Sequence, residues 1–364
     1  MSDRVLRAAV IGLGWAGEQH IKAYQAMSGT EVVALADPNP TLLAQVQARY
    51  GVEHRFNDYR EMLEWGELDL VSVATPNFAH AEPAIDALDH GCHVLVEKPL
   101  ARTYAEGLSM VEAAERNDRV LQVMFNQRFR PDVQVMKRFI DEGGLGDIYH
   151  AKSRWLRRSG IPGRGRKWFV SQELAGGGPL IDLGVHMLDM GLYAMGEPQV
   201  TAVSGVTYDR LGQKFVTHLY GEDAVYEVED FATALIRLED GKTLQLETSW
   251  ATYREDGDYI NLMLYGDQGG AEMRTRNYES RGAVTFYVDS AGVPAEVRPE
   301  VPPRDTGTPG HELAARIFVE RVLSGQFAEH RGREGLLRTW IIDAIYRSAH
   351  EGREILLEEL ADEL

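Results

Sequence analysis

An aspartate and a histidine four residues apart, Asp182 and His186, are the first candidates for chemistry in this chain. They follow a flexible glycine run, 176–178, and Pro179, which suits the first turn of a helix. Residues four apart share one helical face, so the carboxylate could orient the imidazole and stabilise its charged form. Histidine titrates near neutral pH and can take a proton from an alcohol. The pair therefore predicts an acid–base site on a helix over 179–195.

The same pair allows two other interpretations. Asp182 and His186 can both ligate a metal ion, but Asp189 alone stands at a useful spacing as a third ligand. The two side chains can also be purely structural, because Leu180, Leu183 and Met187 form an apolar stripe that anchors the same helix. We expect no metal at this site.

A lysine, Lys98, stands after an apolar run, 93–96, that predicts a buried strand, with Glu97 between them. In an open sheet of parallel strands, ligands bind beyond the carboxyl ends of the strands, where this lysine would lie. Pro99 restricts Lys98 to an extended conformation. Such a lysine can simply be solvated, but a fixed cation also stabilises negative charge that develops on a reacting oxygen. Lys98 becomes a functional candidate if the same region binds a cofactor.

Three glycines, Gly12, Gly14 and Gly17, follow the apolar run 6–11 and open a segment with helical spacing. In such a turn the first glycine permits the bend, the second admits a pyrophosphate, and the third lets helix and strand pack closely. The helix N-terminus then points at the phosphates. Asp37, twenty residues after Gly17, ends a second predicted strand, where a carboxylate accepts hydrogen bonds from a ribose. This order of strand, glycines, helix, strand and acid predicts a dinucleotide-binding region.

The first 126 residues supply the elements that would position these groups. Short apolar runs alternate there with segments of helical spacing, which predicts a mostly parallel sheet covered by helices on both faces. The predicted strands after the first are 32–36, 70–74, 93–96 and 120–125.

The pattern changes after about residue 126. Asp240 and Gly241 separate two alternating stretches, which is typical of a hairpin and hence of antiparallel strands. The strand-like stretches are 147–156, 199–208, 231–238, 243–252 and 258–265, and a terminal helix is predicted over about 333–350. The second region is therefore predicted to be a large, open, mainly antiparallel sheet with helices.

Composition excludes several classes of protein. A net charge of −18 over 364 residues argues against nucleic-acid binding, which needs clustered Lys and Arg. The single cysteine, Cys92, excludes an internal disulfide and a cysteine-based zinc site, and it fits a small core residue. Neither an amino-terminal signal pattern nor an apolar stretch of roughly 18 residues is visible, so we expect a cytoplasmic protein that does not bind membranes.

Four of these motifs together resemble those of the glucose–fructose oxidoreductase / inositol dehydrogenase family (Gfo/Idh/MocA). They are the glycine turn, the triplet 97–99 (Glu-Lys-Pro), the run 126–131 (Asn-Gln-Arg-Phe-Arg-Pro) and the Gly-Gly-x3-Asp-x3-His pattern that ends at His186. The likeness extends over nearly the whole chain. It implies an α/β protein with a Rossmann domain over 1–126 and a C-terminal α+β domain over 127–364.

The same resemblance implies a chemistry and an assembly. It implies hydride transfer between NAD(P) and a carbon of a sugar, cyclitol or related polyol. Lys98 would bind and polarise the reacting oxygen, His186 would be the acid and base, and Asp182 would assist or contact the substrate. The open sheet of such proteins commonly forms a dimer interface, so we expect a homodimer or homotetramer. The terminal helix is expected to pack back toward the first domain.

The expected cofactor is NAD, because the Asp37 carboxylate would repel the additional phosphate of NADP. His80 is as well explained by a structural role as by ligand binding. The expected cofactor-binding residues are Gly12, Leu13, Gly14, Trp15, Ala16, Gly17, Asp37, Thr75, Pro76, Asn77, His80, Glu97, Lys98, Asn126 and Arg128.

A basic stretch departs from the acidic average of the chain. Its seven cations, with no acid among them, are Lys152, Arg154, Arg157, Arg158, Arg164, Arg166 and Lys167. Tryptophan can stack on a sugar ring and arginine can hold hydroxyls or a carboxylate, so Arg157, Arg158 and Trp168 are substrate candidates, and an anionic polyol becomes conceivable. The alternative is that these cations pair with acids elsewhere or across a subunit interface.

Two rival functions use the same scaffold. A redox-neutral glycosidase or lyase that retains NAD would use the same lysine and histidine, and accumulation of NADH would distinguish it from a dehydrogenase. A non-catalytic NAD-dependent regulator would not need Lys98, Asp182 and His186 together.

Overall fold

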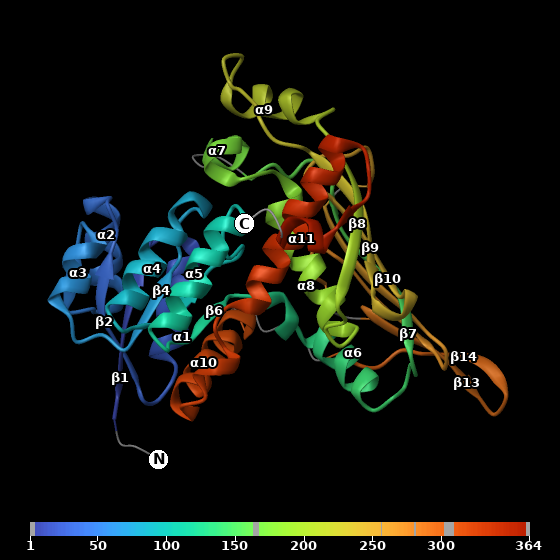
Figure 1. Ribbon diagram of the computed structural model, residues 1–364, viewed down its shortest axis with the longest axis horizontal. Helices are drawn as coiled ribbons and strands as arrows, with labels where there is room; N and C mark the ends of the chain where they lie inside the picture. Colours follow the sequence, from blue (N-terminus) through green and yellow to red (C-terminus); the bar gives the residue numbers. More distant parts are fainter. Residues whose placement is uncertain (1–3, 163–166, 256, 280–281, 302–308, 362–364) are drawn as a thin grey trace. The chain divides into compact units, whose positions relative to one another are not determined.

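The computed structural model describes residues 4–162, 167–255, 257–279, 282–301 and 309–361, which form two compact units (Figure 1). The N-terminal unit comprises Met1–Asn126 and Gly307–Thr339, and the C-terminal unit comprises Gln127–Thr306 and Trp340–Leu364. The first division falls where the sequence pattern changes. The continuous region expected over 127–364 differs from this division, because the chain enters the N-terminal unit again over 307–339.

The N-terminal unit is built on a six-stranded sheet in which every paired strand is parallel. The strands are β1 (Leu6–Ile11), β2 (Thr30–Ala36), β3 (His54–Phe56), β4 (Leu70–Val73), β5 (His93–Val96) and β6 (Leu121–Val123). Their order, β3-β2-β1-β4-β5-β6, is that of a doubly wound Rossmann sheet, in which the winding direction reverses between β1 and β4. Every residue of β4 and β5 is buried, as strands covered on both faces require. The predicted parallel sheet is confirmed.

The helices between the strands are α1 (Trp15–Gln25), α2 (Pro40–Tyr50), α3 (Tyr59–Trp65), α4 (Ala81–Asp89) and α5 (Tyr104–Arg116). Three of these five helices, α2, α3 and α5, begin with a side-chain cap. Asn39 accepts hydrogen bonds from two amides at the start of α2, and Thr103 accepts one from Glu106 at the start of α5.

The returning segment is held to the sheet by side chains of the same unit. It contains α10 (Pro309–Ser324), η6 (Phe327–Glu329) and the first part of α11 (Arg333–Glu351). Gln122 on β6 donates to the Ala314 carbonyl at 2.9 Å, and Arg321 donates to Gln122 Oε1 at 2.9 Å. These contacts explain why residues 307–339 form one unit with the first 126.

The C-terminal unit is built on a nine-stranded sheet in the order β14-β13-β12-β11-β7-β10-β9-β8-β15. The strands are β7 (Ile148–Arg157), β8 (Val200–Tyr208), β9 (Phe231–Leu238), β10 (Thr243–Ser249), β11 (Asp258–Gly266), β12 (Gly270–Arg276), β13 (Val284–Ser290), β14 (Val293–Val297) and β15 (Ile355–Leu356). β7 and β10 pair in parallel and the other neighbours are antiparallel, so the mainly antiparallel prediction is confirmed. The β9–β10 hairpin turns at Asp240 and Gly241, both with positive φ.

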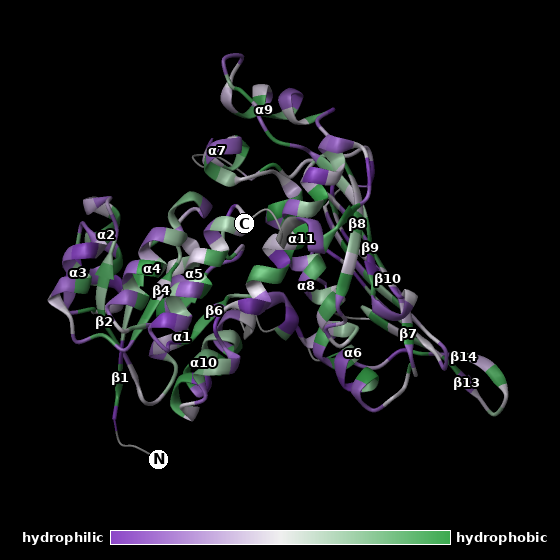
Figure 2. Ribbon diagram, in the orientation of Figure 1, coloured by the Kyte–Doolittle hydropathy of each residue, from purple (hydrophilic) through white to green (hydrophobic). Residues whose placement is uncertain are grey.

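Helices cover one side of this sheet. Figure 1 shows α6 (Pro131–Asp141) and α8 (Val185–Ala194) along that side. The other α-helices of this unit are α7 (Gln172–Ala175), α9 (Gly212–Tyr220), α12 (Leu357–Ala361) and the second part of α11, from residue 340 on. Along β7, Ala151, Ser153 and Trp155 are buried, whereas Lys152 and Arg154 are partly exposed. Figure 2 shows both hydrophobic and hydrophilic residues along these strands. We call the side opposite α8 the outer face.

The helix predicted over 179–195 is two elements rather than one. A π-helical turn, η4 (Leu180–Gly184), precedes α8. The Thr248 hydroxyl donates to the Pro179 carbonyl at 2.8 Å beside this turn, and a Cβ at Gly184 would lie 3.1 Å from Thr248 Cγ2. A side-chain hydroxyl that bonds a helix carbonyl competes with the regular hydrogen bonds of the helix. Single π-helical turns are frequent at functional sites. Among the described residues, no helix is both long and apolar enough to cross a membrane.

Candidate active site

The glycine turn between β1 and α1 assigns a separate steric role to each glycine. Gly12 has φ +85°, and a Cβ there would lie 2.7 Å from the Ala74 carbonyl oxygen at the end of β4. A Cβ at Gly17 would lie 2.0 Å from the Gly12 carbonyl oxygen, so α1 packs directly on the strand end. A Cβ at Gly14 would meet no described atom within 4 Å. Contacts within the protein therefore require glycine at positions 12 and 17. The open space at Gly14 leaves room for a pyrophosphate at the helix N-terminus.

Asp37 lies beside this turn at the end of β2. Its Oδ2 accepts a hydrogen bond from the Leu13 amide at 2.9 Å, and its Oδ1 accepts one from the Asn39 amide at 2.8 Å. A carboxylate can accept about four hydrogen bonds, so capacity remains for ribose hydroxyls. The charge argument against the additional phosphate of NADP applies to this geometry, and the residues of the turn fit NAD.

The loop after β4 is tied to the loop after β5 by His80. Its ring nitrogens lie 2.8 Å from the Pro99 carbonyl oxygen and 2.9 Å from the Thr75 carbonyl oxygen, and the side chain is buried. Burial lowers the pKa of His80. Of the two interpretations of His80, this geometry favours the structural one. Pro76 and Asn77 lie in the same loop, where Asn77 begins a short 3-10 turn, η1 (Asn77–Ala79).

Lys98 is positioned by the buried Glu97 before it. Glu97 Oε2 accepts a hydrogen bond from the Lys98 amide at 3.2 Å, and Oε1 lies 3.0 Å from His20 Nε2. His311 Nε2 lies 3.7 Å from the same oxygen. Burial alone would raise the pKa of Glu97, but the hydrogen bond with His20 and the nearby His311 imidazole hold it well below its usual range. We therefore interpret Glu97 as a support for Lys98 rather than as a cofactor ligand.

The run that follows β6 is divided between the two units. The Asn126 side chain lies 3.1 Å from His311 Nδ1 in the N-terminal unit. Arg128 belongs to the C-terminal unit, where its Nε donates to Asp189 Oδ2 at 2.6 Å and its guanidinium lies over the Tyr193 ring. Arg128, which was expected to bind the cofactor, is therefore ion-paired with Asp189. Asp189 is the residue whose spacing suggested a third metal ligand. Within the described ranges, no group of three potential metal ligands is present.

Asp182 and His186 stand on η4 and α8 with separate aromatic neighbours. Asp182 Oδ2 accepts a hydrogen bond at 3.0 Å from the indole of Trp250, which is fully buried. The His186 ring lies 5.8 Å from the Trp155 ring, centroid to centroid, and the residue is 7% exposed. Asp182 lies within the π-helical turn, and His186 lies in the first turn of the α-helix that follows it. Trp250 thus fixes the carboxylate that was expected to orient the histidine.

Two described members of the basic stretch, Arg154 and Arg157, are paired with acids. Asp258 Oδ1 accepts from Arg157 Nε at 2.5 Å and from Trp155 Nε1 at 2.7 Å, and Arg154 lies 3.2 Å from Glu247. Burial alone would lower the pKa of Arg157, but Asp258 and Asp182 raise it. The geometry favours ion pairing over an anion site at Arg157.

The other substrate candidates lie at the edge of the same stretch. Arg158 is exposed, and Trp168 stacks on Phe169 with ring centroids 3.8 Å apart. Arg164 and Arg166 lie outside the described residues.

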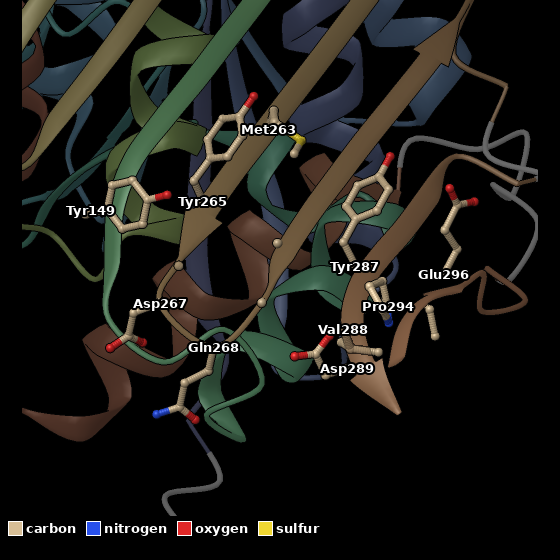
Figure 3. Close-up of a pocket in the computed structure, with 14 residues that line it drawn as sticks. Tyr149, Met263, Tyr265, Asp267, Gln268, Tyr287, Val288, Asp289, Pro294 and Glu296 are labelled. Carbon is tan, nitrogen blue, oxygen red and sulfur yellow. The ribbon is translucent and has the colours of Figure 1, made fainter. Parts of the chain in front are cut away.

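A hollow of about 680 Å³ lies elsewhere in the C-terminal unit, at the ends of β11 to β14 (Figure 3). Tyr149, Tyr265 and Tyr287 line it, together with the carboxylates of Asp289 and Glu296. It includes no residue that the sequence singled out, so we do not assign it to the chemistry.

The sequence did not identify the groups that hold the candidate residues. These are His20 and His311 behind Glu97, Trp250 at Asp182, Asp258 at Arg157, and Glu229 at the glycine run 176–178. Their partners stand far away in sequence, and no local spacing connects them. Only Glu229 had a signal in the sequence, because it forms an acidic pair with Asp230 directly before a predicted strand.

Comparison with known proteins gives consistent matches. Residues 6–125 match the family described as "Oxidoreductase family, NAD-binding Rossmann fold", and residues 133–272 match the "GFO/IDH/MocA C-terminal domain". The chain is 32% identical to a D-glucoside 3-dehydrogenase of Escherichia coli (strain K12), over 98% of this chain and 99% of that one. It is 32% identical to a levoglucosan dehydrogenase of Pseudarthrobacter phenanthrenivorans, over 79% and 77% of the two chains. A structure of levoglucosan dehydrogenase with NADH and L-sorbose superimposes with a TM-score of 0.86 at 26% identity, covering 97% of this chain and 99% of that one.

Proposed function

This chain belongs to the Gfo/Idh/MocA oxidoreductase family, and from that premise we propose that it transfers a hydride between a secondary alcohol of a neutral sugar or cyclitol and NAD. The observation that carries the proposal is the glycine turn. Gly12 and Gly17 are required by protein contacts, whereas Gly14 is open at a helix N-terminus beside Asp37. This arrangement supports NAD binding rather than a tight turn of purely structural origin.

NAD, when bound, supplies the nicotinamide that accepts the hydride from the carbinol carbon. Lys98 binds the substrate oxygen and stabilises the negative charge that develops there as the hydride leaves. His186 takes the hydroxyl proton as general base, and it returns a proton when the ketone is reduced. Asp182, held by the Trp250 indole, contacts the substrate or stabilises the charged imidazole.

A neutral substrate is favoured by the electrostatics of the basic stretch. Arg157 is paired with Asp258 and Arg154 with Glu247, so these cations are already compensated. The relatives are named for D-glucoside and levoglucosan, which carry no charge at neutral pH. We therefore propose neutral glycosides and cyclitols as substrates in preference to uronates and sugar phosphates.

We also propose that a second copy of this chain covers the outer face of the C-terminal sheet. Val206 and Tyr208 are more than two-fifths exposed there, and Lys152 and Met263 are partly exposed across β7 and β11. An open sheet face with apolar side chains commonly forms an oligomer interface. Sedimentation of the protein, with Tyr208→Glu as the disrupting variant, tests this. A monomer in both cases would overturn it. We also propose a cytoplasmic location, where free NAD is available, and cell fractionation tests it.

The reaction is tested with a panel of neutral glycosides, cyclitols and their keto forms, following NADH in both directions. Net NADH formation with an alcohol supports the proposal. Conversion of a glycoside without NADH accumulation would indicate internally recycled NAD instead. NAD binding without turnover over the whole panel would indicate a regulator.

A further inference from the structure

A buried carboxylate, Glu229, lies at the beginning of the turn that carries Asp182. Its Oε2 accepts a hydrogen bond from the Gly178 amide at 2.9 Å, and its Oε1 accepts one from the Leu180 amide at 2.9 Å. The Tyr346 hydroxyl donates to Oε1 at 3.0 Å. Amides at a helix start have no partner within the helix, so this carboxylate and hydroxyl complete the turn.

The close approach of the Glu229 main chain and of Tyr346 requires glycine at two positions of the run before the turn. A Cβ at Gly178 would lie 2.1 Å from the Glu229 carbonyl oxygen, and a Cβ at Gly177 would lie 1.9 Å from the Tyr346 hydroxyl oxygen. A side chain at either position would displace Glu229 or Tyr346. The run that the sequence presented as flexible is therefore a point of close approach.

The other side of the turn is held by β10 and the residue after it. The Thr248 hydroxyl donates to the Pro179 carbonyl at 2.8 Å, and the Trp250 indole donates to Asp182 Oδ2 at 3.0 Å. Glu229 thus accepts hydrogen bonds from the amides at the start of the turn. Thr248 and Trp250 donate hydrogen bonds to oxygen atoms on its other side. A substitution of Glu229 therefore removes hydrogen bonds from the amide side of the turn and leaves those of Thr248 and Trp250 in place.

The charge state of Glu229 is sensitive to pH in the neutral range. Burial raises the pKa of Glu229 to about 7, against the hydrogen bonds from Leu180, Gly178 and Tyr346, which lower it. Tyr226 faces its main chain and donates to the Glu229 carbonyl at 2.7 Å, and the neighbouring Asp230 is also a buried acid. The Gly178 and Leu180 amides can only donate, and the hydroxyl oxygen of a protonated carboxyl is a weaker acceptor than a carboxylate oxygen, so protonation of Glu229 weakens its hold on these amides.

We propose that Glu229 is a positioning residue, whose carboxylate holds the η4 turn so that Asp182 and His186 are set for proton transfer. The proposal rests on the function given above for that pair. Glu229 touches neither the substrate nor NAD, and it acts through the backbone of the glycine run and the turn.

The first test compares Glu229→Gln with the parent enzyme. The amide keeps the size of the side chain but offers one acceptor oxygen where two amides donate. We expect kcat to fall roughly 10- to 100-fold above the pKa of Glu229, because small displacements of reacting groups have effects of this size. The dissociation constant for NAD should stay unchanged. A folded variant with parental kcat and pH profile would overturn the proposal.

Tyr346→Phe gives a second and more specific readout. Loss of the hydroxyl donor destabilises the charged form, so the pKa of Glu229 rises and the acidic limb of the kcat profile moves to higher pH. A limb that stays in place in a folded Tyr346→Phe enzyme would contradict the proposal. Asp230→Asn is the matched control, because Asp230 accepts from the Gly212 amide at 2.7 Å at the start of α9 instead. It should leave kcat and its pH profile unchanged.

A readout without turnover separates this proposal from the proposed reaction. The Trp250 indole N–H reports on Asp182, and its nuclear magnetic resonance signal, assigned with Trp250→Phe, should shift with pH near neutrality in the parent. The shift should vanish in Glu229→Gln and persist in Asp230→Asn. Failure of the sugar panel with an intact Trp250 titration would overturn the reaction alone. A Trp250 signal that titrates equally in Glu229→Gln would overturn the positioning role alone.

Discussion

The imidazole of His20 and the carboxylate of Glu97 lie 3.0 Å apart, Nε2 to Oε1, inside the N-terminal unit. The other nitrogen of His20 lies 2.9 Å from the Ser72 hydroxyl, which in turn lies 2.9 Å from the Tyr24 hydroxyl. Because the second oxygen of Glu97 accepts the Lys98 amide, this polar network in the core fixes the main chain of the candidate catalytic lysine.

Replacement of Glu97 by glutamine should destabilise the N-terminal unit at neutral pH. A buried hydrogen bond to a charged group is worth about 1–3 kcal/mol, and we expect a loss of this order in urea unfolding. The pKa of Glu97 is depressed in the folded state, so its contribution is present above the unfolded pKa of about 4.3 and disappears as pH falls through the folded value. The difference between parent and Glu97→Gln should therefore narrow below about pH 4. Glu82→Gln, in an exposed pair with Arg60, is the control and should change stability by less than about 1 kcal/mol.

Lys98→Met should lose turnover without losing NAD. Removal of one donor that stabilises a developing oxyanion typically lowers kcat by about 10²–10³. Kinetics with the best sugar of the panel, together with a fluorescence titration of NADH, would measure both properties. Lys22→Met on the exposed side of α1 serves as the control. Parental kcat in Lys98→Met would remove Lys98 from the mechanism.

Alanine at Gly14 and alanine at Gly17 should have opposite consequences. The Gly14 site has negative φ and open space, so Gly14→Ala should unfold at the parental temperature while NAD binding weakens about tenfold or more, because its methyl group faces the pyrophosphate. Gly17→Ala places a methyl group 2.0 Å from the Gly12 carbonyl oxygen and should destabilise the protein by about 1–3 kcal/mol or more. Thermal unfolding and calorimetric titration with NAD would measure the two effects. Equal NAD affinity in Gly14→Ala and the parent would contradict the assigned pyrophosphate site.

Preference for neutral sugars should depend on Asp258. In the parent, Asp258 pairs with the half-buried Arg157, and we expect sugar acids to inhibit at least about tenfold more weakly than the matching neutral sugars. Asp258→Asn leaves Asp182 as the remaining acidic neighbour of Arg157 and removes its ion-pair partner, so inhibition by the acids should strengthen. Glu247→Gln removes the partner of Arg154 on the outer face and should leave inhibition unchanged. Strong inhibition of the parent by sugar acids would contradict the proposed neutral substrate.

Much of the N-terminal unit could be predicted, because the residues that determine its strands and its glycine turn lie close together in the sequence. Gly12, Gly14, Gly17 and Asp37 stand at fixed spacings around two apolar strands, and each role depends on neighbours in sequence or on the next strand. The structure confirms the parallel sheet and places Lys98 at the end of β5. The strands β12 to β14 were not predicted, because much of their surface is exposed and polar residues interrupt their apolar pattern.

The sequence by itself determined the dinucleotide turn, the doubly wound sheet and the identities of Lys98, Asp182 and His186 as candidates. Only the tertiary structure decided which side chains hold these candidate residues in place. Glu229 reaches the glycine run across 51 residues, Trp250 reaches Asp182 across 68, and His20 reaches Glu97 across 77. Such partners meet because sheet register and helix packing bring distant strand ends together, and no local periodicity encodes that register. The π-helical turn at Asp182 also has a distant partner, because the Thr248 hydroxyl donates to the Pro179 carbonyl beside it.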